Sequence, residues 1–370
     1  MLNRHKSIAF LLLFVMFIGS IAVFTSCSSE QTQISEKAKY AIYSDQSVEE
    51  ISQQLVKTEA AVEENKTVEK ISNLREFKKA LSIGKGMSDV DVAKEMLRAM
   101  GYAEDIIERM PEAALLDTLN YTEHFAQTEF IPVADDDDAE AGSAVAATEN
   151  FSGSATSSGI TIMVTMSVDP ENRRIKNAAW FDCSGNDLVV TSDQSQSILI
   201  NKRGRQYISI LTDQSKYANV NNSEGMSFAI MGYDYHDKKT NVFKPSESYD
   251  ITGRNYVYTD EKVRPTIYSC SFGFDLPNDN SNGNSLLVNW FYECYNFRFY
   301  MQYYTIYNMS DYDAKKIKVI SEASYSKPET LSYGFDISLS PGSLGAGISF
   351  SQVKGYKQIA TAQLSASIMR

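Results

Sequence analysis

Histidine and cysteine are scarce in this chain of 370 residues, which contains 3 histidines and 4 cysteines. So few cysteines, scattered along the sequence, cannot build a disulfide scaffold or a zinc ribbon. Basic residues are also outnumbered: 35 Lys and Arg stand against 47 Asp and Glu, so the formal net charge is −12. Because non-specific binding of nucleic acid needs clustered Lys and Arg, this balance argues against a nucleic-acid partner.

Motifs for enzyme chemistry are missing as well. The chain has no phosphate-binding loop, no dinucleotide fingerprint, and neither a His-Glu-x-x-His nor a Gly-x-Ser-x-Gly motif. Beyond the first residues only His124 and His236 occur, which excludes a histidine-rich metal site. We therefore predict no metal, no cofactor and no catalytic residue. A carboxylate-dependent hydrolase stays open as an alternative, since 47 acidic residues offer many pairs.

A short basic region opens the chain, formed by Arg4, His5 and Lys6, and an apolar run follows over residues 8–24. Only Gly19 and Ser20 interrupt that run. The pattern predicts a secretory signal peptide. An ordinary membrane-spanning helix is the alternative, because about 17 apolar residues are just enough to cross a bilayer.

The sequence Phe24-Thr25-Ser26-Cys27 at the end of this run resembles the lipobox of bacterial lipoproteins. The resemblance implies that Cys27 receives diacylglycerol and palmitate and becomes the N-terminus of the mature chain. Removal of residues 1–26, with Arg4 and Lys6, would change the net charge from −12 to −14. The protein would then be anchored to the bacterial cell membrane or outer membrane and face away from the cytoplasm.

Composition divides the remaining chain into four segments. At 43% hydrophobic and 22% charged residues, the chain can bury a core, and its length favours two folded units. Helical periodicity runs from Val48 to Leu81 with an interruption at Asn65, and further short helices follow, whereas acidic and small residues dominate around Asp135–Asp138. We predict a signal peptide at residues 1–26, a tether at 27–40, a helical domain at 41–131, a linker at 132–158 and a β-domain at 159–370.

Residues 86–119 contain a Gly-Met-Ser helix start and the sequences Leu-Arg-Ala-Met-Gly-Tyr and Ile-Glu-Arg-Met-Pro-Glu. They resemble short helical modules of uncharacterised secreted proteins from Gram-positive bacteria, which also have a β-rich C-terminal domain. The resemblance implies a compact helix-packing unit and no known reaction. A structural spacer and a partner-docking module are both consistent with it.

Beyond residue 159 the hydrophobic period changes to two. Apolar and polar residues alternate from Ile160 to Val168, and further short strands follow at fairly even spacing. This pattern predicts an antiparallel β-sandwich or barrel-like domain, and hence an α+β fold. Because Ser and Thr alternate with Ala, Leu and Ile near the C-terminus, a pore-forming or membrane-inserting β-protein is a third possibility for the function.

Cys270 and Cys294 lie at nearly equal distances from an Asn- and Gly-rich loop at residues 277–285. In an antiparallel hairpin, residues equidistant from the turn face each other at a distance close to that of a disulfide. Since the oxidising environment outside the cytoplasm permits disulfides, we predict a possible bridge between these cysteines. Two buried thiols are the alternative.

The strand expected between residues 286 and 307 is far longer than usual and rich in aromatic residues. Tyr292, Arg298, Tyr300 and Tyr304 fall on one face of an uninterrupted strand. Tyrosine offers a flat surface and a hydroxyl group, which suit stacking on sugars or contact with a protein. We predict a possible binding face here, with core packing as the alternative.

These observations together predict a membrane-anchored extracytoplasmic lipoprotein with a non-catalytic binding or interaction β-domain. Its ligand would be an envelope glycan or protein. A carboxylate-dependent glycan hydrolase of the cell envelope is the alternative function.

The anchor is directly testable. Once the signal peptide is removed, no apolar run approaches the roughly 20 residues that a spanning helix needs, so retention depends on the acyl chains. We expect wild-type protein to incorporate a fatty-acid analogue in living cells and to enter the detergent phase of a phase separation, and Cys27→Ser to do neither. Label that persists in Cys27→Ser would contradict the prediction.

Overall fold

The computed structural model describes much of the chain after residue 35. The described ranges are 36–63, 65–132, 159–184, 190–191, 206–213, 217–221, 226–260, 264–265, 269–274, 288–307, 316–328 and 356–369. The predicted signal peptide at residues 1–26, Cys27, the run of aspartates at 135–138 and the loop at 277–285 lie outside the described residues.

Antiparallel β-sheet dominates the structure, and the strands form two sheets. The large sheet has the order β1-β2-β3-β4-β5-β13-β9-β10, with β6 and β8 also paired to β13. Its strands are β1 Val56–Glu63, β2 Lys66–Ser72, β3 Glu123–Pro132, β4 Gly159–Asp169, β5 Arg174–Asp182, β6 Val190–Thr191, β8 Tyr217–Asn221, β9 Phe228–Asn241, β10 Tyr249–Thr259 and β13 Val288–Tyr307. The small sheet has the order β11-β12-β7-β14-β15, with β7 Gln206–Thr212, β11 Arg264–Pro265, β12 Ser269–Phe274, β14 Lys316–Pro328 and β15 Tyr356–Met369.

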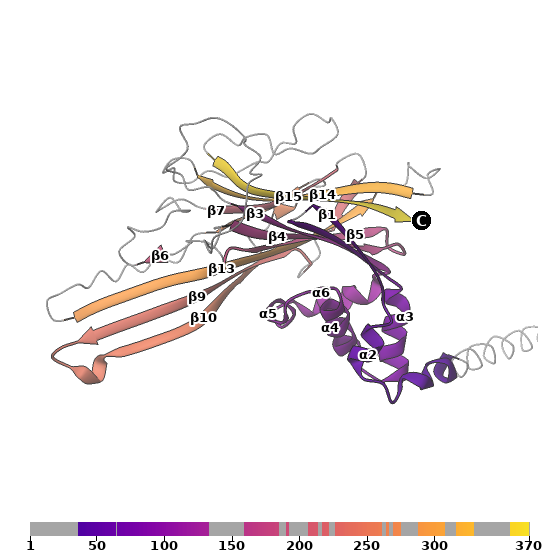
Figure 1. Cartoon of the computed structure of the whole chain (residues 1–370), viewed down its shortest axis with the longest axis horizontal. Helices are drawn as coiled ribbons and strands as arrows, with labels where there is room; N and C mark the ends of the chain where they lie inside the picture. The colour runs from indigo at the N-terminus through magenta and orange to yellow at the C-terminus, as the bar shows by residue number, and fades with distance from the viewer. Residues whose placement is uncertain are drawn as a thin grey trace, which may run out of the picture.

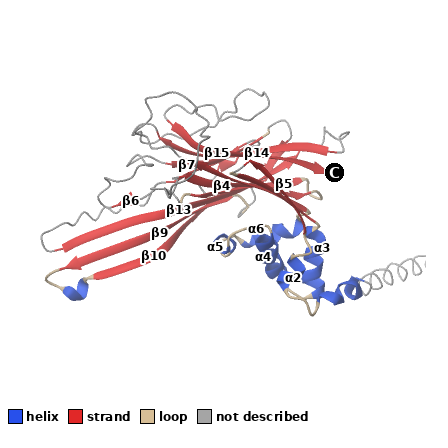
Figure 2. Cartoon of the chain, viewed as in Figure 1, coloured by secondary structure: helices blue, strands red, loops and turns tan. Residues whose placement is uncertain are grey.

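The helices gather in the N-terminal part of the described chain, apart from one turn between β9 and β10 (Figure 2). They are η1 Ala41–Tyr43, α2 Val48–Ser52, α3 Leu74–Lys79, the π-helical turn η2 Ala80–Gly84, α4 Asp89–Ala99, α5 Glu104–Ile107, α6 Glu112–Asp117, η3 Thr118–Asn120 and η6 Pro245–Glu247. Ser47 caps α2 through the predicted capping box with Glu50, and the Ser88 hydroxyl caps α4. The α+β class is therefore confirmed.

The helical interpretation of residues 55–72 is wrong, because these residues form the antiparallel hairpin β1–β2. β2 in turn pairs with β3, so the first part of the chain contributes three strands to the large sheet. The predicted linker also connects neighbours within that sheet: Pro132 and Gly159, which flank residues 133–158, are register partners. The sheet therefore crosses the expected boundary between a helical domain and a β-domain.

The central part of the large sheet lies between the helices on one face and the small sheet on the other (Figure 1). On one face, Ala178, Phe228 and Tyr300 pack with the side chains of the helices, and we call this helical cover the helical layer. On the other face, the large sheet shares a core with the small sheet. In the described part of the chain both strand orders have two ends, so neither sheet closes on itself.

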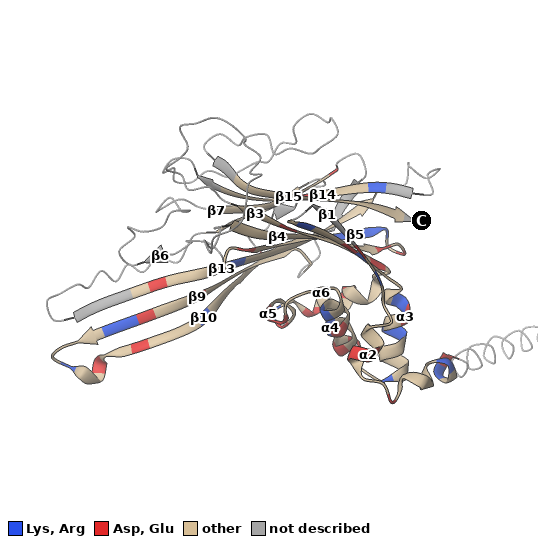
Figure 3. Ribbon diagram, in the orientation of Figure 1, with Lys and Arg blue, Asp and Glu red and all other residues tan. Residues whose placement is uncertain are grey.

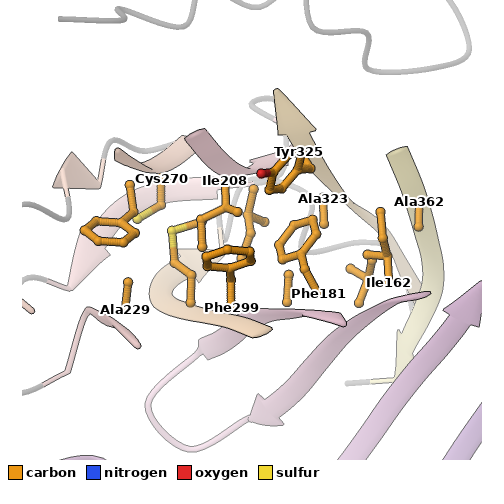
Figure 4. Close-up of a cluster of buried hydrophobic side chains, with 14 of the residues drawn as sticks. Ile162, Phe181, Ile208, Ala229, Cys270, Phe299, Ala323, Tyr325 and Ala362 are labelled. Carbon is orange, nitrogen blue, oxygen red and sulfur yellow. The ribbon is translucent and has the colours of Figure 1, made fainter. Parts of the chain in front are cut away.

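The core between the sheets follows the alternation seen in the sequence (Figure 4). Alternate residues of β4 from Ile160 to Val168 point into it from the large sheet, and alternate residues of β15 from Ala360 to Ile368 enter from the small sheet. Phe274 of the small sheet stacks on Phe299 of the large one, with ring centroids 4.2 Å apart. Such an aromatic pair stabilises the fold by more than its buried apolar area alone accounts for.

A β-bulge in β13 decides which residues of this strand enter which core. Tyr295 pairs with Asp234 and Arg298 with Gly232, so β13 uses one residue more than β9 between these pairs. Asn296 lies at the bulge with a φ of 53°, in the left-handed region. Cys294 before the bulge and Phe297 after it therefore both point into the core between the sheets.

The bulge can be tested by substitution at Asn296. We expect Asn296→Val to lower the free energy of unfolding by about 1 kcal/mol more than Asn296→Gly, because only the β-branched residue is strained at positive φ. Both variants lose the same side-chain hydrogen bond to Asp234, so their difference in urea midpoint isolates the backbone. Equal midpoints would show that the positive φ imposes no strain.

Candidate functional site

The predicted disulfide between Cys270 and Cys294 is not formed, and both residues are buried thiols. Cys270 lies on β12, where it pairs with Ile210 of the small sheet, whereas Cys294 lies on β13 opposite Tyr235 of the large sheet. The prediction failed because it assumed that consecutive strands pair as a hairpin. Burial raises the pKa of the thiols of Cys183 and Cys270, which suits inert core residues.

Tyr300 and Tyr304 do not belong to an exposed binding face. Their exposed fractions are 1% and 0%, and the helical layer covers them. The Tyr304 hydroxyl lies 2.9 Å from that of Tyr121, which donates to Asp117 of α6 at 2.9 Å. Arg174 of β5 in turn binds Asp117. These two predicted binding residues therefore help to fasten the helical layer to the sheet.

His124 and Lys176 lie in the same buried polar layer. The His124 Nδ1 atom is 2.8 Å from the Ser167 hydroxyl, and burial followed by the charge of Lys176 lowers the pKa of His124 to about 3. The Lys176 Nζ atom lies 4.4 Å from the ring centroid of Tyr102 and 5.1 Å from that of Tyr121. Cation–π contacts with two rings thus compensate in part for the burial of this lysine.

A more accessible group of polar residues lies where the large sheet extends beyond the helices. Figure 1 shows β9, β10 and β13 running past the helical layer to the η6 turn. We call this three-stranded extension, residues 233–255 with 288–298, the arm. The coloured bands of Figure 3 show that its strands carry charges of both signs.

One face of the arm carries a charged network around Asp234. Arg254 donates from Nε to one oxygen of the Asp234 carboxylate at 2.7 Å, and Asn296 donates to the other at 2.9 Å. Arg298 lies 3.9 Å from the same carboxylate. Farther along the arm, the Asp250 carboxylate contacts His236 at 2.6 Å and Lys238 at 3.1 Å. We call Asp234, His236, Asp250, Arg254, Asn296 and Arg298 the arm face.

Both carboxylates of the arm face favour the ionised form. Partial burial raises the pKa of Asp234, but the hydrogen bonds from Arg254 and Asn296 outweigh this effect and lower it overall. The hydrogen bonds of His236 and Lys238 lower the pKa of Asp250. The side chain of Arg254 remains 44% exposed, so part of it is accessible from solvent.

The arm face begins where the helical layer ends. Tyr256 of β10 donates a hydrogen bond to Asp105 of α5 at 2.6 Å, and the Arg109 guanidinium stacks on the Tyr256 ring at 3.6 Å from its centroid. Arg254 is the next residue on the same side of β10, and its guanidinium lies 3.5 Å from the Tyr256 hydroxyl. The network is thus linked to α5 through Tyr256, and its residues stand on three strands that pair with one another. Both constraints preorganise its hydrogen-bond donors.

Of the predicted binding residues, only Arg298 lies in this network. Tyr292 points to the opposite side of the arm and stacks on Tyr235, with ring centroids 6.5 Å apart. The sequence reasoning missed Asp234 and Arg254. The alternation of aromatic and polar residues in Tyr233-Asp234-Tyr235-His236 was the available signal, because it continues the period of the preceding strand.

Among the described carboxyl groups, Asp117 and Asp169 lie close together, but both are buried and both bind Arg174. Glu322 of β14 is a second candidate for acid–base chemistry. Burial raises the pKa of Glu322 to about 7, against an opposing hydrogen bond from Gln363 at 3.2 Å. A raised pKa suits a general acid, but hydrolysis of a glycosidic bond needs a second carboxylate nearby. The residues opposite Glu322 in the sheet are Leu211 and Gln363, and neither is acidic.

Two kinds of feature are absent from the described residues. No group of three or more His, Cys, Asp or Glu side chains is placed to hold a metal ion there. Likewise, none of the helices described is both long enough and apolar enough to span a membrane.

No protein-family model matches this chain, and no curated protein matches it either. Among solved structures, the chain is similar to the NetB toxin of Clostridium perfringens in its membrane-inserted form, at 9% sequence identity and a TM-score of 0.18. The match covers 57% of this chain and 91% of the toxin chain. A TM-score this low does not establish a shared fold, so the likeness carries no functional argument.

The buried polar layer predicts how stability depends on pH. The folded-state pKa of His124, about 3, is below its ordinary value of 6.5, so the unfolded chain binds the proton first as the pH falls. This contribution to stability is full above pH 6.5 and falls by up to about 1.4 kcal/mol per pH unit between 6.5 and 3. Lys176, Lys57 and Tyr102 are the titratable groups around it.

We expect His124→Gln to flatten the loss of unfolding free energy between pH 6.5 and pH 4, because the variant has no imidazole to protonate on unfolding. Urea unfolding at a series of pH values measures this slope independently of any constant offset that the substitution causes. The same slope in wild type and variant would contradict the assignment.

Proposed function

We propose that this protein is a membrane-anchored extracytoplasmic binding lipoprotein, and that the arm face is its ligand-binding surface. The observation that carries the proposal is the network of Arg254, Asp234, Asn296 and Arg298, which is preorganised by hydrogen bonds and yet accessible. Buried polar groups such as Thr165 and Lys176 contact Tyr102 of the helical layer, whereas Arg254 and Asp234 bind each other and remain partly exposed.

The chemistry of the arm face favours a polar ligand such as an envelope glycan or a polar protein segment. Two guanidinium groups and an imidazole offer several donors, and Asp234 and Asp250 offer acceptors for sugar hydroxyl groups. Guanidinium groups also bind carboxylates in a bidentate manner, as on acidic sugars. In this proposal the two sheets form an open β-sandwich that presents the arm, and acyl chains on Cys27 retain the protein at the membrane.

Binding can be measured on a glycan array and with isolated envelope fractions, using the mature chain without its lipid. We expect Arg254→Ala to weaken binding by about tenfold or more, since a hydrogen bond to a charged group contributes about 1.5–3 kcal/mol. The matched control is Arg75→Ala, which removes another exposed arginine that pairs with a carboxylate, Glu171 at 2.7 Å, on the helical layer. This control should bind as wild type does.

Failure of the wild-type chain to bind any glycan or envelope fraction would contradict the proposal. Cleavage of a model envelope glycan would favour the alternative, a carboxylate-dependent hydrolase. In that case Glu322, whose pKa is raised to about 7, is the residue to replace, and Glu322→Gln should abolish the activity.

A further inference from the structure

The tip of the arm exposes two adjacent apolar side chains. Val242 and Phe243 follow the end of β9, and their exposed fractions are 69% and 71%. They lie between β9 and β10, whose connection forms the far end of the arm (Figure 1), and neither belongs to a hydrophobic core. An adjacent pair of this kind at an extremity differs from the single exposed apolar residues that are common on protein surfaces.

The turn that presents this pair is closely hydrogen-bonded. The Asn241 side-chain oxygen accepts from the backbone N–H groups of Phe243 and Lys244 at 3.1 and 3.0 Å. The Asn241 backbone donates to the Ser248 hydroxyl at 2.8 Å, and the Asn241 amide group donates to Glu247 at 3.2 Å. Because local hydrogen bonds hold the backbone, the exposure of Val242 and Phe243 is built into the turn.

The size of the pair favours a lipid surface over a protein partner. A phenylalanine side chain buries about 150–250 Å², whereas a stable protein interface needs about 800 Å² from each partner. A bilayer interface accepts a small convex apolar tip, because lipid head groups and acyl chains rearrange around it.

The charge at the tip also favours a lipid surface. Residues 238–250 contain three lysines, Lys238, Lys239 and Lys244, and two acidic residues, which give +1, while the whole chain carries −12. Lys238 pairs with Asp250 and Lys244 with Glu247, so the tip is a slightly positive, largely compensated site on an acidic protein. Anionic head groups attract its lysines within a Debye length.

The position of the tip also agrees with a membrane. In Figure 1 the tip and the first described residues, which precede η1, lie at opposite ends of the long axis. Both lie on the side of the large sheet that carries the helical layer, away from the small sheet. One flat surface could therefore meet both ends.

We infer that the β9–β10 tip is a second membrane contact, in which Val242 and Phe243 enter the interfacial region of an anionic bilayer. The anchor at Cys27 and the tip would hold the molecule at two points and keep the helical layer and the arm face toward the membrane. Which membrane the tip contacts in the cell rests on the proposed function, because the lipid anchor selects that membrane. The affinity of the tip for a bilayer is independent of the anchor and can be measured without it.

The test uses the mature chain with Cys27→Ser, produced without residues 1–26, and flotation with vesicles of phosphatidylcholine containing one third phosphatidylglycerol. We expect this chain, with Val242 and Phe243 intact and called wild type in this test, to float with the vesicles. The double variant Val242→Ser with Phe243→Ser should bind at least about tenfold more weakly, because burial of a phenylalanine contributes about 1.5–3 kcal/mol. Binding should also weaken in vesicles of phosphatidylcholine alone.

The matched control is Val257→Ser on β10. Val257 is also exposed, at 40%, but it lies eight residues from the start of the strand, roughly 26 Å from the tip. This variant should bind vesicles as wild type does. Circular dichroism of all variants verifies that they remain folded.

Two results would overturn the inference. One is a wild-type chain that does not bind the vesicles, or that binds them as weakly as the double variant. The other is self-association in the absence of lipid that the double variant abolishes, since sedimentation would then identify a second copy of the chain as the occupant of the tip. Neither result would affect the fatty-acid labelling that tests Cys27.

Discussion

The structure depends on one strand, β13, whose two faces must be buried against different layers. β13 spans 20 residues and pairs with β5 and β9 along its length. After the bulge at Asn296, its odd-numbered residues enter the core between the sheets, while Tyr300 and Tyr304 enter the helical layer. Because one extra residue exchanges the faces of a strand, this bulge keeps Cys294 and Phe297 in the same core.

The contact between the helical layer and the large sheet is more polar than the core between the sheets. Burial of Arg174, Asp117 and His124 would be costly without partners, but ion pairs and hydrogen bonds join these groups to each other and to neighbouring hydroxyls. Because hydrogen bonds and ion pairs are directional, this polar layer fixes the orientation of the helices on the sheet, in addition to the apolar contacts. It also explains the acid sensitivity predicted for His124, since its neutral form is the one that fits.

Where the helical layer ends, the same three strands continue as the arm with different surfaces. On the arm face, charged groups bind each other while part of each remains accessible, as for Arg254 and Asp234. At the tip, apolar side chains replace them. A sheet that is stabilised on both faces at its base can carry such an extension, because the pairing of β9 with both β10 and β13 continues into the arm.

Local patterns in the sequence correctly predicted the class of the fold and the inward residues of β4 and β15. Alternation with a period of two involves only neighbouring residues, so it can be recognised in the sequence without the tertiary structure. The same local logic failed between residues 55 and 72, where Val62, Val68 and Ile71 fit a helix as well as a hairpin. Pairing of β2 with β3 resolved that ambiguity in favour of strands.

Properties that depend on distant residues could not be read from the sequence. The symmetric spacing of Cys270 and Cys294 predicted a hairpin, yet their strands belong to different sheets. Tyr300 and Arg298 have the same parity, but the helical layer covers the first and leaves the second on the arm face. By itself the sequence determined the α+β class and the alternation of the strands, because these follow from local composition and period. Only the tertiary structure decided which strands pair, where the bulge exchanges the faces of β13 and which polar residues stay accessible, because these depend on contacts between residues far apart in the chain.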